Sequence, residues 1–75
     1  MTKEQINLLK EFKTELSTSL NFYEKSVKQF NKNAEQKGLD FHDKLYWKNE
    51  LEYCNTKIKT LKEKIRIIDE MLRDA

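Results

Sequence analysis

The second half of the sequence carries an uninterrupted heptad repeat. Apolar residues recur at alternating spacings of four and three positions, and they are Trp47, Leu51, Cys54, Ile58, Leu61, Ile65, Ile68 and Leu72. This spacing fills every a and d position of a coiled-coil helix over that range. Such a stripe is stable in water only when it packs against another helix, so the sequence predicts an all-α protein built by helix packing.

The first half of the sequence supplies a matching stripe. Its members are Ile6, Leu9, Lys13, Leu16, Leu20, Tyr23, Val27, Phe30 and Ala34. Lys13 is the one polar member, and two interpretations of it stay open. Its aliphatic stem can lie along the stripe while the ammonium reaches water. Alternatively, it is a polar residue that fixes the register or the oligomeric state of the helices.

Capping residues and a single glycine set the expected boundaries. Thr2 and Gln5 match the capping-box pattern, and Asp40 is a favourable N-cap for a second helix. Gly38 suits the left-handed backbone position that closes a helix. We therefore expect one domain over residues 1–75, with helices over about 3–37 and 41–73 and a turn at 38–40. So short a connection predicts an antiparallel, coiled-coil-like hairpin in which residue i lies opposite about residue 76 − i.

Seven large apolar residues lie outside the a and d positions. They are Leu8, Phe12, Phe22, Tyr46, Tyr53, Ile67 and Met71, and we call them the second stripe. Antiparallel pairing brings Phe12 to the same end as Ile67, and Phe22 beside Tyr53. Because extended exposed apolar surface usually marks an interface, we expect two hairpins to pair through this stripe as a homodimeric four-helix bundle. The alternative is that the stripe docks a different protein. The sequence does not decide how two hairpins would be oriented.

Aromatic residues gather near the expected turn. Phe41, His42 and Tyr46 are the ones least easily placed in a core, so they are candidates for binding a partner protein. Cys54 occupies a d position, where a free cysteine behaves as a small apolar residue, and we expect it in the core.

A basic run forms a second candidate site. It consists of Lys57, Lys59, Lys62, Lys64 and Arg66. Several phosphate contacts can drive strong binding, so these residues are candidates for holding nucleic acid or a nucleotide-like anion. They occupy b, e and g positions, however, which is typical of the solvated flanks of a coiled coil.

Composition excludes several other classes of function. The chain has one cysteine, one histidine and a net charge of +2, so neither an internal disulfide nor a dense metal site is expected. It has no Gly-rich phosphate loop and no catalytic motif, so we expect neither an enzyme nor a cofactor. The polar N-terminus and the lack of a long apolar run predict a cytoplasmic protein with no membrane partner.

The predicted function is therefore that of a small protein-interaction module. Lysine outnumbers arginine 13 to 2 and asparagine occurs six times, a bias typical of AT-rich genomes. With the small size, this favours a phage- or mobile-element-type inhibitor or adaptor that binds and sequesters one host protein. A dimeric binder of nucleic acid or a small anionic ligand is the second hypothesis, and a structural or scaffolding subunit is the third.

Overall fold

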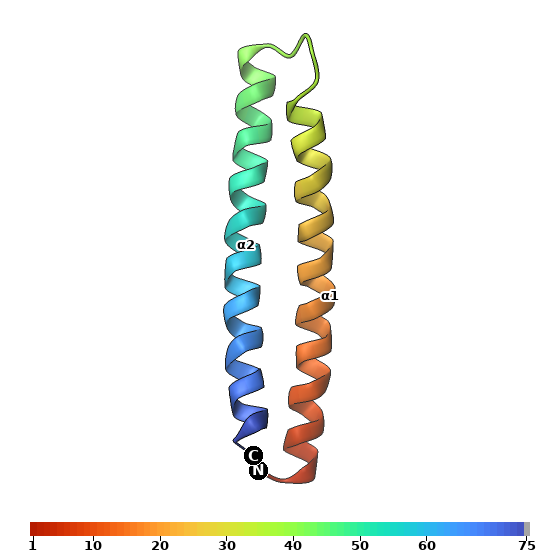
Figure 1. Ribbon diagram of the computed structural model, residues 1–75, viewed down its shortest axis with the longest axis vertical. Helices are drawn as coiled ribbons and strands as arrows, with labels where there is room; N and C mark the ends of the chain where they lie inside the picture. The colour runs from red at the N-terminus through yellow and green to blue at the C-terminus, as the bar shows by residue number, and fades with distance from the viewer. Residues whose placement is uncertain (75) are drawn as a thin grey trace.

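The computed structural model describes residues 1–74, which form two long α-helices joined by a short loop. α1 spans Lys3–Ala34 and α2 spans Phe41–Arg73. The helices run antiparallel and side by side, with the loop at one end and both chain termini at the other (Figure 1). The hairpin is a rod of 57 × 14 × 13 Å. The predicted all-α hairpin is confirmed.

Both helices begin at the predicted capping residues. The hydroxyl of Thr2 accepts a hydrogen bond from the Gln5 amide at 3.1 Å, and Gln5 Oε1 accepts one from the Thr2 amide at 2.9 Å. At the start of α2, Asp40 Oδ1 accepts a hydrogen bond from the Asp43 amide at 2.8 Å. These bonds satisfy amides that the first turn of a helix leaves without partners.

The first helix ends earlier than the expected position near residue 37. α1 stops at Ala34 with Glu35 as its C-cap. Gly38 does take a positive φ of 85°, but it lies within the loop and turns the connection rather than closing the helix. The physical reason lies in the pairing of the two helices. Phe41, the first residue of α2, lies opposite about residue 35, so a longer α1 would have no helix to pack against.

The a and d residues form the contact between the helices. Every member of the two predicted stripes is buried or half-buried. Leu16, Leu61 and Ile68 form the central cluster, and the side chains packed against it are Leu9, Leu20, Tyr23, Ile65 and Leu72. The heptad interpretation is therefore confirmed over the length of both helices, and we call this contact the a/d seam.

Aromatic contacts across the a/d seam fix the register of the hairpin. The rings of Phe30 and Trp47 lie 5.3 Å apart between centroids, and those of Tyr23 and Tyr53 lie 6.4 Å apart. Both pairs match the expected pairing of residue i with about residue 76 − i.

Lys13, the polar member of the seam, reaches across to the other helix. Its Nζ lies 2.5 Å from Oδ1 of Asp69, and both side chains are about half exposed, at 40% and 50%. The stem therefore lies along the seam while the ammonium lies at its edge, as the first of the two interpretations expects. An ion pair this exposed contributes little to stability, commonly about 1 kcal/mol or less.

The core of the hairpin is thin. Within residues 1–74 no large side chain is completely buried. The accessible surface is 6082 Å², whereas a compact monomer of this mass exposes roughly 4,900 Å². A single pair of helices also leaves large apolar side chains exposed on both helices.

Candidate interaction surface

The second stripe occupies one flank of both helices. Continuing the heptad from the a/d seam places Leu8, Phe22, Tyr46, Tyr53 and Ile67 at c positions and Phe12 and Met71 at g positions. In an antiparallel pair the g positions of both helices lie on the same side of the seam. The c and g positions of α1 and α2 therefore form one surface, which we call the c/g face. All seven residues of the second stripe are exposed on it.

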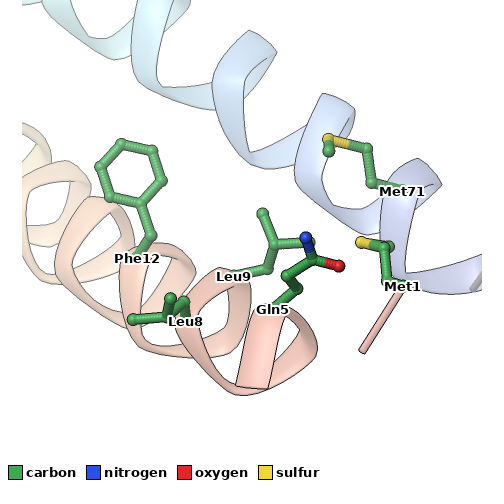
Figure 2. Close-up of a pocket in the computed structure, with 6 residues that line it drawn as sticks. All are labelled: Met1, Gln5, Leu8, Leu9, Phe12 and Met71. Carbon is green, nitrogen blue, oxygen red and sulfur yellow. The ribbon is translucent and has the colours of Figure 1, made fainter. Parts of the chain in front are cut away.

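The end of the c/g face near the chain termini is an open apolar groove, which we call the terminal groove. It has a volume of about 520 Å³ and is lined by Met1, Gln5, Leu8, Leu9, Phe12 and Met71. Figure 2 shows α1 supplying four of these side chains, with Met71 of α2 and Met1 completing the groove. Met1 is exposed and was not among the predicted interface residues. It lies one heptad before Leu8, so its c position could have identified it.

An aromatic patch made of Phe22, Tyr23 and Tyr53 lies in the middle of the hairpin on the c/g face. The Phe22 and Tyr23 rings meet edge to face at 5.4 Å, and Tyr23 in turn contacts Tyr53. Lys57 Nζ lies 5.6 Å from the centroid of the Tyr53 ring, within range of a cation–π interaction. Burial raises the pKa of the Tyr23 phenol, and the neighbouring Tyr53 adds to the shift. Phe22 and Tyr53 thus present exposed rings that rest on the seam beneath them.

A polar band separates the terminal groove from the aromatic patch. Its members at c and g positions are Glu15, Ser19, Thr60 and Lys64, and all four are exposed. Neither Glu15 nor Lys64 forms an ion pair within the part of the chain that the structure describes. The c/g face therefore has two apolar regions with charged groups available between them.

The opposite flank, made of b and e positions, is polar over most of its length. Its central residues include Lys10, Thr14, Ser17, Asn21, Asn55, Lys59 and Lys62. A shallow hollow of about 470 Å³ on α1 is lined by Lys10, Lys13, Thr14, Ser17, Thr18, Asn21 and Leu72. Hydroxyls of Thr14 and Thr18 donate to backbone carbonyls one turn earlier. Of the two flanks, the c/g face is therefore the one that carries the large exposed apolar side chains.

The basic run is divided between the two flanks. Lys57 and Lys64 lie at g positions on the c/g face, whereas Lys59, Lys62 and Arg66 lie on the b/e flank. The Arg66 guanidinium donates hydrogen bonds to Glu63 and, at 2.5 Å, to Glu70. These contacts lower the pKa of Glu63 and raise that of Arg66. A single hairpin therefore does not gather the five basic residues into one anion-binding patch.

The predicted partner-binding residues point to different sides of the turn end. Phe41 is 73% exposed, the largest value among the bulky apolar residues from 1 to 74. It lies on the b/e flank with Leu45, one helical turn away, which is also exposed and was not predicted. The centroids of the Phe41 and His42 rings are 6.1 Å apart. Tyr46 lies on the c/g face instead, where its ring centroid is 4.9 Å from that of Trp47.

Cys54 is a core residue, as the sequence predicted. Its side chain is 3% exposed at the a/d seam. Burial raises the pKa of its thiol, and the charge of Glu50 adds to the shift. A protonated, enclosed thiol has the opposite properties to those of a reactive cysteine.

The described residues offer neither a metal-binding cluster nor a span for a bilayer. Between Met1 and Asp74 no group of three or more His, Cys, Asp or Glu side chains is placed to hold a metal ion. Over the same residues neither helix is long and apolar enough to cross a membrane. No family model, curated protein or solved structure matches the chain.

Proposed function

We propose that this chain is a non-enzymatic protein-interaction module that works by helix packing, and that its first partner is a second copy of itself. The observation that carries the proposal is the contrast between an apolar c/g face and a polar b/e flank. Large apolar side chains on one side of a soluble rod are stabilised when a second surface removes them from water. Two hairpins that meet on their c/g faces form a four-helix bundle.

The exposed area supports self-association of this kind. The hairpin exposes 6082 Å², roughly 1,200 Å² more than a compact monomer of its mass. A stable protein–protein interface buries about 800 Å² on each partner. The excess surface is therefore large enough to supply such an interface, and the c/g face is where apolar side chains concentrate.

A second protein would bind at the turn end. Phe41 and Leu45 lie on the b/e flank, so pairing of the c/g faces leaves them in water. An aromatic and an aliphatic side chain one helical turn apart are typical anchors for a partner groove. In this proposal the bundle is the scaffold, and the turn end is the surface with which an inhibitor or adaptor binds and sequesters its target.

A matched pair of variants tests self-association. Phe12→Glu places a charge in the terminal groove, and Thr14→Glu places the same charge two residues away on the b/e flank. We expect the parent and Thr14→Glu to have the mass of a dimer in light scattering, and Phe12→Glu to have that of a folded monomer. A parent that is monomeric at every concentration over a hundredfold range, or a Phe12→Glu variant with the parent's mass, would contradict the proposal.

A third variant tests the turn end. Phe41→Ser should keep the dimer mass and lose a stoichiometric protein partner that the parent captures, while Thr14→Glu should keep that partner. Capture of nucleic acid that weakens steeply between low and physiological salt would instead support the anionic-ligand hypothesis. Self-assembly into larger oligomers, with no other protein bound, would support a scaffolding role.

A further inference from the structure

The c/g face allows two symmetric pairings of hairpins. When the two-fold axis runs parallel to the helices, α1 of each copy packs against α2 of the other, and both turns lie at the same end. When the axis runs across the helices, α1 packs against α1 and α2 against α2, and the turns lie at opposite ends. The positions of side chains along the c/g face distinguish the two arrangements.

Contacts within one hairpin show which residues of α1 and α2 lie at the same height along the rod. The Phe30–Trp47 and Tyr23–Tyr53 contacts show that residues whose numbers add to 76 or 77 lie at the same height. A two-fold axis parallel to the helices leaves height unchanged. Residue i of α1 would therefore face about residue 76 − i in α2 of the second copy.

In the parallel arrangement the apolar regions of one copy meet the corresponding apolar regions of the other. Leu8 lies at the height of residue 68, beside Ile67 of the second copy. Phe12 lies at the height of Lys64, whose aliphatic stem can cover the ring, and within one turn of the same Ile67. Phe22 lies at the height of residue 54, beside Tyr53. The terminal grooves of the two copies thus close on each other, and so do the aromatic patches.

The polar band is also complementary in this arrangement. Glu15 lies at the height of residue 61, between Thr60 and Lys64 of the second copy. Because the symmetry repeats the contact, two Glu15–Lys64 pairs would lie in the middle of the interface. Both groups are free within the described part of the hairpin, so each has a charge available for the other copy.

The crossed arrangement can cover both apolar regions of each copy in only one register. That register places Phe12 opposite Phe22 of the second copy and Ile67 opposite Tyr53. It then places Lys64 within one residue of the position opposite Lys57. Two ammonium groups would meet there in each half of the interface, and like charges across an interface oppose association.

The remaining contacts separate the two arrangements less sharply. In the crossed dimer Met71 would lie between Tyr46 and Glu50 of the second copy, and Leu8 would face Ser26. In the parallel dimer Leu8 lies beside Ile67, and Met71 lies at the height of Gln5 with Leu8 one turn away. The contrast between a Lys57–Lys64 repulsion and a Glu15–Lys64 attraction is therefore what decides between the arrangements.

We infer that two hairpins pair with their two-fold axis parallel to the helices, so that α1 of each copy packs against α2 of the other and the Glu15–Lys64 pairs join the copies. This inference rests on the proposed self-association. It places both turn ends, each with its Phe41 and Leu45, at the same end of the bundle. The bundle therefore presents both partner-binding patches at one end, on its two opposite outer faces, rather than at opposite ends of a rod of 57 Å.

Charge reversal distinguishes the arrangements by the sign of its effect. Lys64→Glu removes an attraction to Glu15 in the parallel dimer, so the dimer dissociation constant should rise about three- to tenfold. In the crossed dimer it removes a repulsion from Lys57, and the constant should fall. The double variant Glu15→Lys, Lys64→Glu should return the constant to within about twofold of the parent's. Lys62→Glu, on the b/e flank, is the control and should leave it unchanged.

A distance measurement provides an independent test. A spin label on Gln36→Cys, an exposed loop position, would be used in a Cys54→Ala background. Electron–electron resonance should give a label separation under about 30 Å in the parallel dimer, because packed helices lie about 10 Å apart. The crossed dimer would separate the labels by most of the 57 Å length of the rod.

The possible outcomes separate this inference from the function on which it rests. A dimer with a long label distance, or one strengthened by Lys64→Glu, overturns the parallel orientation and leaves self-association standing. A parent that is monomeric in light scattering overturns both. If the label disturbs association, the sign of the Lys64→Glu effect decides the orientation.

Discussion

Ile67 and Ile68 are adjacent residues of the same type in different surroundings. Comparing the unfolding free energies of Ile67→Ala and Ile68→Ala therefore distinguishes a residue of the c/g face from a residue of the a/d seam. Ile68 is 4% exposed in the central cluster with Leu16 and Leu61, whereas Ile67 is 44% exposed. Truncating a buried isoleucine to alanine costs about 2–5 kcal/mol, because the transfer free energy is lost and a cavity is left. In a two-helix seam that can partly collapse, we expect about 3 kcal/mol for Ile68→Ala.

The cost at Ile67 should depend on whether the second copy is present. In a single hairpin the side chain is about half buried, so its loss costs about 1 kcal/mol with no enclosed cavity. The higher helix propensity of alanine returns about 0.4 kcal/mol, which leaves a net cost of about 0.6 kcal/mol. In the dimer Ile67 packs against the other copy, so the cost should grow as protein concentration rises.

Urea unfolding followed by far-ultraviolet circular dichroism measures both costs. The two variants and the parent would be unfolded at protein concentrations about a hundredfold apart. Their unfolding free energies would be compared where the dependence of the free energy on urea concentration is the same. Equal costs for Ile67→Ala and Ile68→Ala at low concentration would refute the assignment of the a/d seam. A cost at Ile67 that does not change with concentration would refute burial of the c/g face in a dimer.

Three further changes test the loop and the core. Asp40→Ala removes the cap that accepts from the Asp43 amide and should cost about 1 kcal/mol in unfolding free energy, with Asp40→Asn close to the parent. Gly38→Ala should cost about 1 kcal/mol from the positive φ alone, because an added Cβ meets nothing within 4 Å. Folding raises the pKa of the Cys54 thiol and the Tyr23 phenol, so the stability that their neutral forms provide is complete at neutral pH. This stability should be lost as pH rises above about 9. Cys54 should be alkylated only when the protein opens. Alkylation of the folded protein at the rate of a free thiol would contradict the position of Cys54 in the a/d seam.

The sequence predicted the seam and the helix starts because both depend on local rules. A heptad spacing places its apolar members on one side of a helix whatever the partner, and each capping residue acts within one turn. The end of α1 was placed too late because Glu35, Gln36 and Lys37 are all compatible with a helix. What ends the helix is the point at which α2 begins, and that depends on the pairing of two distant segments.

The seven residues of the second stripe could be named from the sequence, and the heptad places all of them at c or g positions. The structure adds that all seven are exposed and that Met1 completes a groove at the terminal end, which depends on how the two helices pack. Leu45 was missed because one apolar residue at a b position has no periodic signal. It becomes meaningful only beside the exposed Phe41.

Lys13 offers a test of what a polar residue contributes within an apolar seam. Lys13→Leu exchanges a half-exposed ion pair with Asp69, commonly about 1 kcal/mol or less, for an apolar side chain at an a position beside Leu9 and Leu16. We expect the hairpin to gain about 0.5–1 kcal/mol in unfolding free energy, with Asp69→Asn as the control that breaks the ion pair without adding apolar surface. A polar residue at such a position can also favour one arrangement of helices over others at a cost in stability. If Lys13 has that role, the leucine variant should be more stable and yet give mixed masses in light scattering. A variant that is more stable and uniformly dimeric would show that Lys13 only lies along the seam, and a destabilised variant would show that the Asp69 contact contributes more than its exposure allows.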